Sequence, residues 1–259
     1  MFDFHIHSRL SFDSEESPEN IIRAAESLGL REICFADHYD LSSERDGRHI
    51  LFSPEEYRAN YGNLHSDKVK IRLGVEFGLT TWNQPELDGF VAEIAPDFVI
   101  GSVHSVGGID PYCPEYWEIH AEPFEKYLLT TLDCVKAHDK FDVLGHLNYV
   151  CKSPCSPHGL PLLYSDYSDI CDEIMKTLAQ KGRGMEINTS GIDRVGVTLP
   201  SLDFLKRFRE LGGEIVTIGS DAHDAARVGK YSDLAVEMAR EVFGYVCTFE
   251  KRKPIFHKL

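Results

Sequence analysis

The chain has 259 residues, with 27 Lys and Arg against 42 Asp and Glu, so its formal net charge is -15. Hydrophobic residues make up 42% and charged residues 27% of the sequence, a globular composition that excludes a disordered or fibrous chain. We expect no duplex nucleic acid as a partner, because proteins bind it mainly through Lys and Arg that neutralise phosphates. We expect no membrane span either, because the longest apolar runs fall well short of the roughly 18 residues that a bilayer requires.

The cysteine content and the N-terminal segment indicate a compartment. The seven cysteines are an odd number, are scattered, and occur in a chain long enough to build its core without disulfides. A strand-like run begins at Phe2, which leaves no room for the charged and apolar regions of a signal peptide. We therefore expect reduced thiols and a cytoplasmic protein. The sequence is compatible with a homodimer, although no segment in it identifies an interface.

Short apolar runs rich in β-branched residues alternate with helical patterns along the chain. The predicted strands, in chain order, are residues 2–6, 32–36, 69–75, 97–103, 142–147, 185–189, 214–218 and 245–249. The predicted helices cover residues 17–29, 122–137, 165–181, 200–213 and 233–243. The first helix has Ser17 as its N-cap, Pro18 in its first turn and Gly29 at its end. Seven or eight strand and helix units favour a parallel sheet that is closed, or nearly closed, into a barrel within a single domain of residues 1–259.

In a β/α barrel the functional side chains project from the C-terminal ends of the strands. The first predicted strand carries His5 and His7, whose spacing of two residues places both imidazoles on one face. Further residues of types that bind metal ions lie in the turn after the first predicted strand or at the ends of the later strands, namely Asp13, His38, Glu76, His104, His146, Asp221 and His223. Each of these residues alone is compatible with a packed histidine or a salt-bridged carboxylate. Together they would be costly to bury at one barrel mouth without ions, because buried ionisable groups need partners.

The types and number of these ligands indicate which ions the site would bind. Mixed imidazole and carboxylate ligands suit Zn, Mn or Fe better than Mg or Ca, which prefer oxygen shells. Nine candidate ligands are too many for one tetrahedral ion, so the sequence predicts two or three divalent transition metal ions. Three carboxylates beside those ions leave a net positive charge, which attracts an anion into an otherwise acidic protein. Because paired metal ions suit phosphoryl transfer, the predicted substrate is a small anionic phosphate ester.

The order of these ligands resembles that of the PHP (polymerase and histidinol phosphatase) superfamily, and the resemblance covers almost the whole chain. Residues 33–38, 97–104, 186–191, 218–223 and 252–259 look like the histidinol-phosphate phosphatase branch. The resemblance implies a distorted (β/α)7 TIM-like barrel and a metal-dependent phosphatase of histidine biosynthesis, which converts L-histidinol phosphate to L-histidinol and phosphate. It also implies that a hydroxide bridging two metal ions attacks phosphorus and that the alkoxide of histidinol leaves.

The resemblance further implies a role for each ligand. The first ion would take His5, His7, Glu76 and Asp221, the second Glu76, His104 and His146, and the third Asp13, His38 and His223. We take Glu76, Asp37 and His223 as the catalytic candidates. Asp37 would either orient its neighbour His38 or protonate the leaving oxygen, and a structural cap on the following turn is an equal alternative.

Two positions differ from the pattern typical of this branch. An Arg often follows the histidine of the fifth strand by six residues, where this chain has Lys152, and another stands where it has Asp193 followed by Arg194. Lys binds phosphate as a point charge, without the two-pronged contact of Arg. We therefore predict that Lys152 and Arg194 contact the phosphate. Two alternatives to the histidinol-phosphatase activity stay open: a PHP phosphoesterase acting on another monoester or on nucleotides, and a metal-binding PHP module without catalysis.

Overall fold

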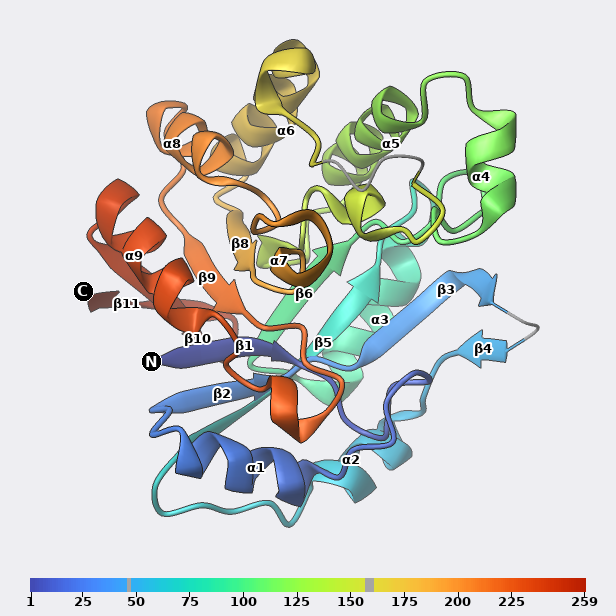
Figure 1. The fold of residues 1–259 in the computed structure, drawn as a ribbon. Helices are drawn as coiled ribbons and strands as arrows, with labels where there is room; N and C mark the ends of the chain where they lie inside the picture. The colour runs from blue at the N-terminus through green and yellow to red at the C-terminus, as the bar shows by residue number, and fades with distance from the viewer. Residues whose placement is uncertain (46–47, 157–160) are drawn as a thin grey trace.

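The computed structural model describes residues 1–45, 48–156 and 161–259 (Figure 1). Its strands are β1 (Phe2–Ile6), β2 (Glu32–Phe35), β3 (His38–Arg45), β4 (Arg48–Ile50), β5 (Lys70–Gly78), β6 (Phe98–Ser102), β7 (Val143–Leu144), β8 (Gly184–Asn188), β9 (Val216–Gly219), β10 (Tyr245–Glu250) and β11 (Lys253–Lys258). Its α-helices are α1 (Pro18–Ser27), α2 (Pro54–Tyr61), α3 (Gln84–Ile94), α4 (Pro114–Ile119), α5 (Pro123–Ala137), α6 (Ser168–Gln180), α7 (Ile192–Val195), α8 (Leu202–Glu210) and α9 (Ser232–Val242). Short 3₁₀ helices cover Tyr149–Lys152, Tyr164–Asp166 and Ala225–Arg227.

Seven strands form a parallel path in the order β1-β2-β5-β6-β7-β8-β9, within a sheet that also includes β3 and β4, and this path curves into a barrel with helices around it (Figure 1). Every neighbouring pair in this order is parallel. β1, at one end of this order, forms hydrogen bonds with the segment that follows β9, at the other end. The amide of Asp221 donates to the carbonyl of His5 at 2.8 Å. The amide of His7 donates to the carbonyl of Ala222, also at 2.8 Å. The predicted parallel, distorted and nearly closed barrel is therefore confirmed.

The strand predicted at residues 245–249 lies outside the barrel. It forms β10, which pairs in antiparallel fashion with β11 in a separate two-stranded sheet. The chain reverses at Lys251 and Arg252, which have φ values of 49° and 65°, so the next segment of the chain becomes the partner of β10. The barrel sheet path therefore uses seven of the eight predicted strands, and the eighth belongs to a C-terminal hairpin.

β3 and β4 form a hairpin that the sequence analysis missed. The missed segment, residues 38–50, is rich in polar residues and lacks the apolar alternation that signals a strand. β3 also pairs in parallel with β5, and this register places His38 opposite Glu76. Two predicted ligands from separate parts of the chain thereby lie on neighbouring strands.

All five predicted helices are present, as α1, α5, α6, α8 and α9. α1 begins as predicted, since the side chain of Ser17 accepts a hydrogen bond from the amide of Asn20. The sequence analysis missed α2, α3, α4 and α7. It missed α2 although Ser53 and Glu56 form a capping box at its start that the sequence displays. Within the described ranges, no helix is both long and apolar enough to cross a bilayer.

The buried carboxylate of Asp3 connects β1 to the segment that follows β9. Asp3 of β1 accepts hydrogen bonds from the Ser220 amide at 2.9 Å, the Ser220 hydroxyl at 2.5 Å and the Gly229 amide at 2.8 Å. Asp3 is completely buried, and burial raises its pKa above the usual value. Because β1 and the segment after β9 both carry predicted ligands, Asp3 helps to hold those ligands in register.

Replacement of Asp3 should weaken this junction. Asp3→Ala leaves two buried donors of Ser220 and the half-buried amide of Gly229 without their acceptor, and each unsatisfied buried group costs about 1–3 kcal/mol. We expect the free energy of unfolding, measured by urea titration with a chelator present, to fall by about 3 kcal/mol. In the control Asp67→Ala, where the side chain is 92% exposed, it should change by less than about 0.5 kcal/mol. A loss below about 1 kcal/mol in Asp3→Ala would contradict this role.

Candidate metal centre

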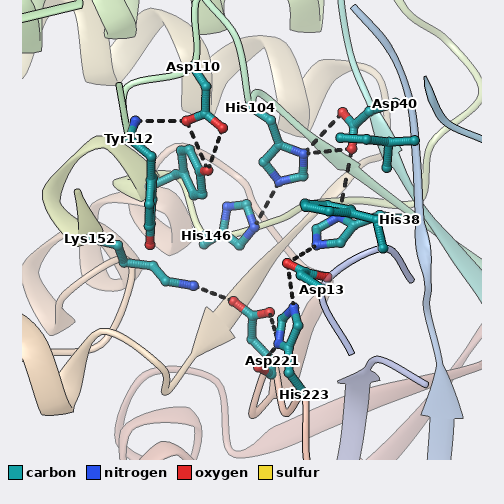
Figure 2. Close-up of a pocket in the computed structure, with 13 residues that line it drawn as sticks. Asp13, His38, Asp40, His104, Asp110, Tyr112, His146, Lys152, Asp221 and His223 are labelled. Atoms are coloured by element: carbon teal, nitrogen blue, oxygen red, sulfur yellow. Dashed lines mark hydrogen bonds and ion pairs between the residues drawn. The ribbon is translucent and has the colours of Figure 1, made fainter. Parts of the chain in front are cut away.

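The nine predicted ligands converge at the C-terminal end of the barrel strands. Six of them line one pocket (Figure 2), namely Asp13, His38, His104, His146, Asp221 and His223. The other three are completely buried and contact pocket residues, namely His5, His7 and Glu76. β1, β3 and β5 and the segments after β1, β6, β7 and β9 supply these side chains. The fold thus brings together residues that are more than 200 positions apart in the sequence.

The first cluster contains three buried atoms without hydrogen-bond partners. Glu76 Oε2 lies 3.2 Å from His5 Nε2 and 3.5 Å from His7 Nε2, and none of these atoms has a hydrogen bond within the described residues. Asp221 Oδ1 lies 3.2 Å from His7 Nε2 and 3.8 Å from His5 Nε2. Buried lone pairs that face one another are unfavourable without a cation or proton between them. The donor set therefore fits a metal ion.

A second cluster forms on the other oxygen of Glu76. Glu76 Oε1 lies 2.8 Å from His146 Nε2 and 3.3 Å from His104 Nε2. The two imidazole nitrogens are themselves only 3.4 Å apart. The hydroxyl of Ser102 donates to the same carboxylate oxygen at 2.7 Å. Each oxygen of Glu76 therefore faces a different cluster, so an ion in either cluster would have an oxygen of this carboxylate beside it.

The third cluster is more exposed than the other two. Asp13 Oδ2 lies 3.2 Å from His223 Nε2 and 3.6 Å from His38 Nε2. His38 also reaches toward the inner clusters, with Nδ1 2.9 Å from Glu76 Oε2. The nine side chains thus lie close together, and contacts such as that of His38 with Glu76 run between the three groups. The assignment of an ion to each group therefore stays a proposal.

Neighbouring charges set the protonation of the buried ligands. Burial alone would raise the pKa of Glu76, but the imidazoles around it, led by His5, hold that pKa well below its usual value. Burial, followed by repulsion from His223, lowers the pKa of His7 well below its usual value. An ionised carboxylate and a neutral imidazole are the forms that bind metal ions. Burial would lower the pKa of His5 as well, but carboxylates led by Glu186 raise it well above its usual value, so an ion at His5 would replace a proton.

Glu186 contacts two predicted ligands and received no role in the sequence analysis. Its Oε1 lies 2.6 Å from His5 Nδ1, and its Oε2 accepts a hydrogen bond of 2.8 Å from the His146 amide. A side chain at Gly219 would overlap both Glu186 and His5, so glycine is needed there. A carboxylate on the far nitrogen of a ligand histidine fixes the orientation of the ring. The sequence did contain a signal for this residue, because Glu186 is a charged residue at the centre of the buried strand β8.

Asp40 is a second acidic residue that the sequence analysis missed. It lines the pocket, with Oδ1 3.1 Å from His104 Nδ1 and Oδ2 3.7 Å from His38 Nδ1. Its spacing of two residues from His38 repeats the signal that links His5 and His7. Because residues 38–45 were not recognised as a strand, that spacing was not applied to them. Asp40 adds a carboxylate to the wall formed by the second and third clusters.

Asp37 is absent from the residues that line the pocket. Its Oδ1 accepts hydrogen bonds from the Ser8 amide at 2.6 Å and the Ser11 hydroxyl at 2.8 Å, and its Oδ2 accepts one from Tyr61. Burial raises the pKa of Asp37 to about 6. Ser11 in turn lies 2.9 Å from His7 Nδ1. Among the alternatives for Asp37, the geometry favours a structural role, although the turn that it holds is the one after β1.

The two predicted phosphate contacts have different surroundings. Lys152 lines the pocket, and its Nζ donates to Asp221 Oδ2 at 2.5 Å (Figure 2). Burial would lower the pKa of Lys152, but Asp221 raises it above its usual value, so the ammonium is charged. Arg194 on α7 is exposed, and its Nη2 donates to the carbonyl of Ser153 at 3.2 Å. The structure brings Lys152 into the pocket and leaves Arg194 outside its lining.

Comparisons with known proteins agree with this geometry. The PHP domain matches residues 3–190 of the chain. The chain belongs to the PHP family. A histidinol-phosphatase of Lactococcus lactis is 34% identical over 232 residues, which cover 87% of this chain and 85% of that protein. A probable histidinol-phosphatase of Clostridium acetobutylicum is 32% identical over 254 residues, which cover 97% of this chain and 98% of that protein.

A solved PHP structure has the same architecture. The crystal structure of histidinol phosphate phosphatase from Lactococcus lactis, in complex with zinc, L-histidinol and phosphate, matches this chain with a TM-score of 0.82 at 30% sequence identity. The match covers 98% of each chain. The resemblance to the histidinol-phosphate phosphatase branch of the PHP family is therefore confirmed, and so is the distorted barrel.

Removing the charge of Glu76 should remove bound metal. Glu76→Gln keeps the size of the side chain but loses the carboxylate that faces both inner clusters. After loading with Zn or Mn and gel filtration, we expect elemental analysis to find at least about one ion per chain fewer than in the wild type. The control is Glu55→Gln, whose side chain is 77% exposed and should leave the metal content unchanged. An unchanged metal content in Glu76→Gln would rule out the bridging position.

Proposed function

We propose that this chain hydrolyses L-histidinol phosphate to L-histidinol and phosphate. The observation that carries the proposal is the Lactococcus lactis phosphatase structure, which holds zinc, L-histidinol and phosphate and matches 98% of this chain. The relatives named histidinol-phosphatase or probable histidinol-phosphatase match over at least 85% of their own length, so the similarity extends over nearly the whole protein. The pocket of this chain adds a charged lysine beside a dense set of metal-ligand side chains.

We propose further that two or three divalent ions of Zn, Mn or Fe bind at the three clusters. Mixed imidazole and carboxylate donors suit these metals, and the unpaired buried nitrogens and oxygen of the first cluster support the assignment. Bound divalent ions would supply Lewis-acid chemistry, which neutralises the charge of a phosphoryl group and lowers the pKa of water. Glu76 would hold the two inner sites together through its separate oxygens.

The protein's own cation would bind and orient the phosphate. Lys152 lies at the pocket wall, where its ammonium would contact a phosphate oxygen as a point charge. The imidazole of His223 lines the pocket and is 28% exposed, so solvent reaches it. Asp37 would act as a positioning residue, because it holds Ser11 and Ser11 contacts the ring of His7.

Apolar and aromatic side chains complete the pocket. Phe12, Ile50, Tyr112 and Tyr149 line it, with the ring of Phe12 5.5 Å from that of His38 and the ring of Tyr149 6.0 Å from Lys152 Nζ. Such surfaces pack against the organic part of a ligand and exclude water from the reacting group. A small ester with an uncharged ring therefore suits the pocket better than bare inorganic phosphate does.

A substrate panel tests the proposed function. With Mn-loaded or Zn-loaded protein, we expect kcat/KM for L-histidinol phosphate to exceed that for AMP and for p-nitrophenyl phosphate by at least about 100-fold. Released phosphate provides the measurement, and a short single-stranded oligonucleotide is assayed in parallel. Uniformly slow rates would favour a PHP phosphoesterase with another substrate. Complete absence of turnover would favour a metal-binding module without catalysis.

Variants of the two cationic residues test the phosphate contacts. Lys152→Ala should lower kcat/KM for L-histidinol phosphate by about 100-fold, because it removes a charge from the pocket wall. Arg194→Ala should lower it by about tenfold or less, because Arg194 lies outside the pocket lining. The control is Lys68→Ala, whose side chain is 75% exposed. If kcat/KM is unchanged in both variants while metal content is normal, the phosphate contacts lie elsewhere.

A further inference from the structure

We refer to the third cluster as the outer cluster and to the first and second clusters as the inner clusters. The ligands of the outer cluster differ from those of the inner clusters in exposure and in the elements that carry them. Two of the outer cluster's three ligands, Asp13 and His223, lie on segments that follow strands, and their side chains are 31% and 28% exposed, while His38 lies on β3. The side chains of the inner ligands His5, His7 and Glu76 are 0% exposed, and β1 and β5 carry His5 and Glu76. Exposed loop residues open more readily than buried strand residues, since fewer contacts order them. The outer site therefore depends on whatever holds its two loops together.

Two side chains of the first loop form hydrogen bonds with the second loop, one at His223 itself and one two residues after it. The hydroxyl of Ser14 donates to the carbonyl of His223 at 2.8 Å. Two residues further on, the amide of Ala225 donates to Glu16 Oε2 at 3.1 Å. Ser14 is the residue next to Asp13, so these bonds join the backbone segments that carry the two loop ligands. We refer to Ser14 and Glu16 as the clasp.

The clasp is anchored at the start of a helix. Glu16 Oε1 accepts hydrogen bonds from the Ser17 amide at 3.0 Å and from Asn20 Nδ2 at 2.6 Å, where α1 begins. The Glu16 amide also bonds the hydroxyl of Ser14 at 3.2 Å. One carboxylate thus connects the rigid end of α1 with the loop that carries His223.

We propose that Ser14 and Glu16 are positioning residues that set the affinity of the outer ion site, and that this site exchanges its ion more readily than the inner sites. The inference rests on the metal centre of the proposed function. Occupancy of the outer site would then make activity follow the concentration of free divalent cation, while the inner ions stay bound. Neither clasp residue lines the pocket, so both act through the backbone of the ligand loops.

Within the described residues, the side-chain hydrogen bonds of the clasp do not extend to the inner clusters. Its side-chain hydrogen bonds go to residues 16, 17, 20, 223 and 225, and within the described part of the chain none reaches an inner ligand. A substitution in the clasp should therefore weaken one ion and spare the others. Loss of a contact that orients a metal ligand typically lowers metal affinity about 10- to 100-fold.

A chelator titration tests the proposal. Wild type, Ser14→Ala, Glu16→Gln and the matched control Glu15→Gln, an exposed neighbour, are loaded with Zn and freed of excess ion. Each protein is then titrated with a chromophoric chelator, and elemental analysis counts the ions that remain. We expect wild type to release one ion well before the rest. In Ser14→Ala and Glu16→Gln the dissociation constant of this ion should rise at least about tenfold, and in Glu15→Gln it should not change.

Two further measurements separate positioning from general destabilisation. Asp13→Asn, which removes a ligand of the outer site, should abolish the early release and leave the later steps unchanged. For Glu16→Gln, excess Zn should restore kcat to the wild-type value, and the unfolding midpoint of the metal-free protein should equal that of Glu15→Gln. A variant that is merely misfolded would pass neither test.

Several results would overturn the inference. It fails if the wild-type ions leave in a single step, if the early release survives Asp13→Asn, or if both clasp variants match Glu15→Gln. A chain that binds no ion would refute both this inference and the metal centre. A chain that releases its ions in the expected order but does not hydrolyse L-histidinol phosphate would refute the proposed function and leave the inference standing.

Discussion

The structure depends on the burial of many ionisable groups at one end of a barrel. Glu76 is completely buried, and its two oxygens face imidazole nitrogens of His5 on one side and His146 on the other. Burying such groups without compensation is unfavourable, because each loses its hydration and several lack a hydrogen-bond donor. Divalent cations between them would offset this cost. They would also make the pocket attractive to an anion, although the chain as a whole carries a charge of -15.

The hydrogen-bond donors around the buried carboxylates of Asp3, Asp37 and Glu76 distinguish their roles. Asp3 and Asp37 each accept bonds from backbone amides and hydroxyls, so they are satisfied by the protein itself and serve to hold segments together. Glu76 Oε2 has no such donor within the described residues and faces only imidazole nitrogens. A buried carboxylate that is surrounded by hydrogen-bond donors therefore stabilises the fold, whereas one that faces imidazole nitrogens is suited to bind a metal ion.

Much of the candidate site could be predicted, because metal ligands of a β/α barrel follow the strands and the strands have a recognisable pattern. The failures have physical causes. Asp40 was missed because the hairpin that contains it is polar and was not recognised as a strand. Glu186 was missed because its role depends on β8 lying close to β1 and β7, which no local pattern encodes. Asp37 stands beside His38 in the sequence, yet its carboxylate bonds the turn after β1.

The sequence by itself determined the parallel barrel, five of the helices and the residue types at the strand ends, because apolar periodicity and the order of ligand residues are local properties of the chain. Only the tertiary structure decided which ligand atoms share a cluster, that Lys152 enters the pocket while Arg194 lies outside its lining, and that β10 leaves the barrel. These features depend on distances between segments far apart in the chain. Such distances follow from strand register and loop packing, which residue order alone does not specify.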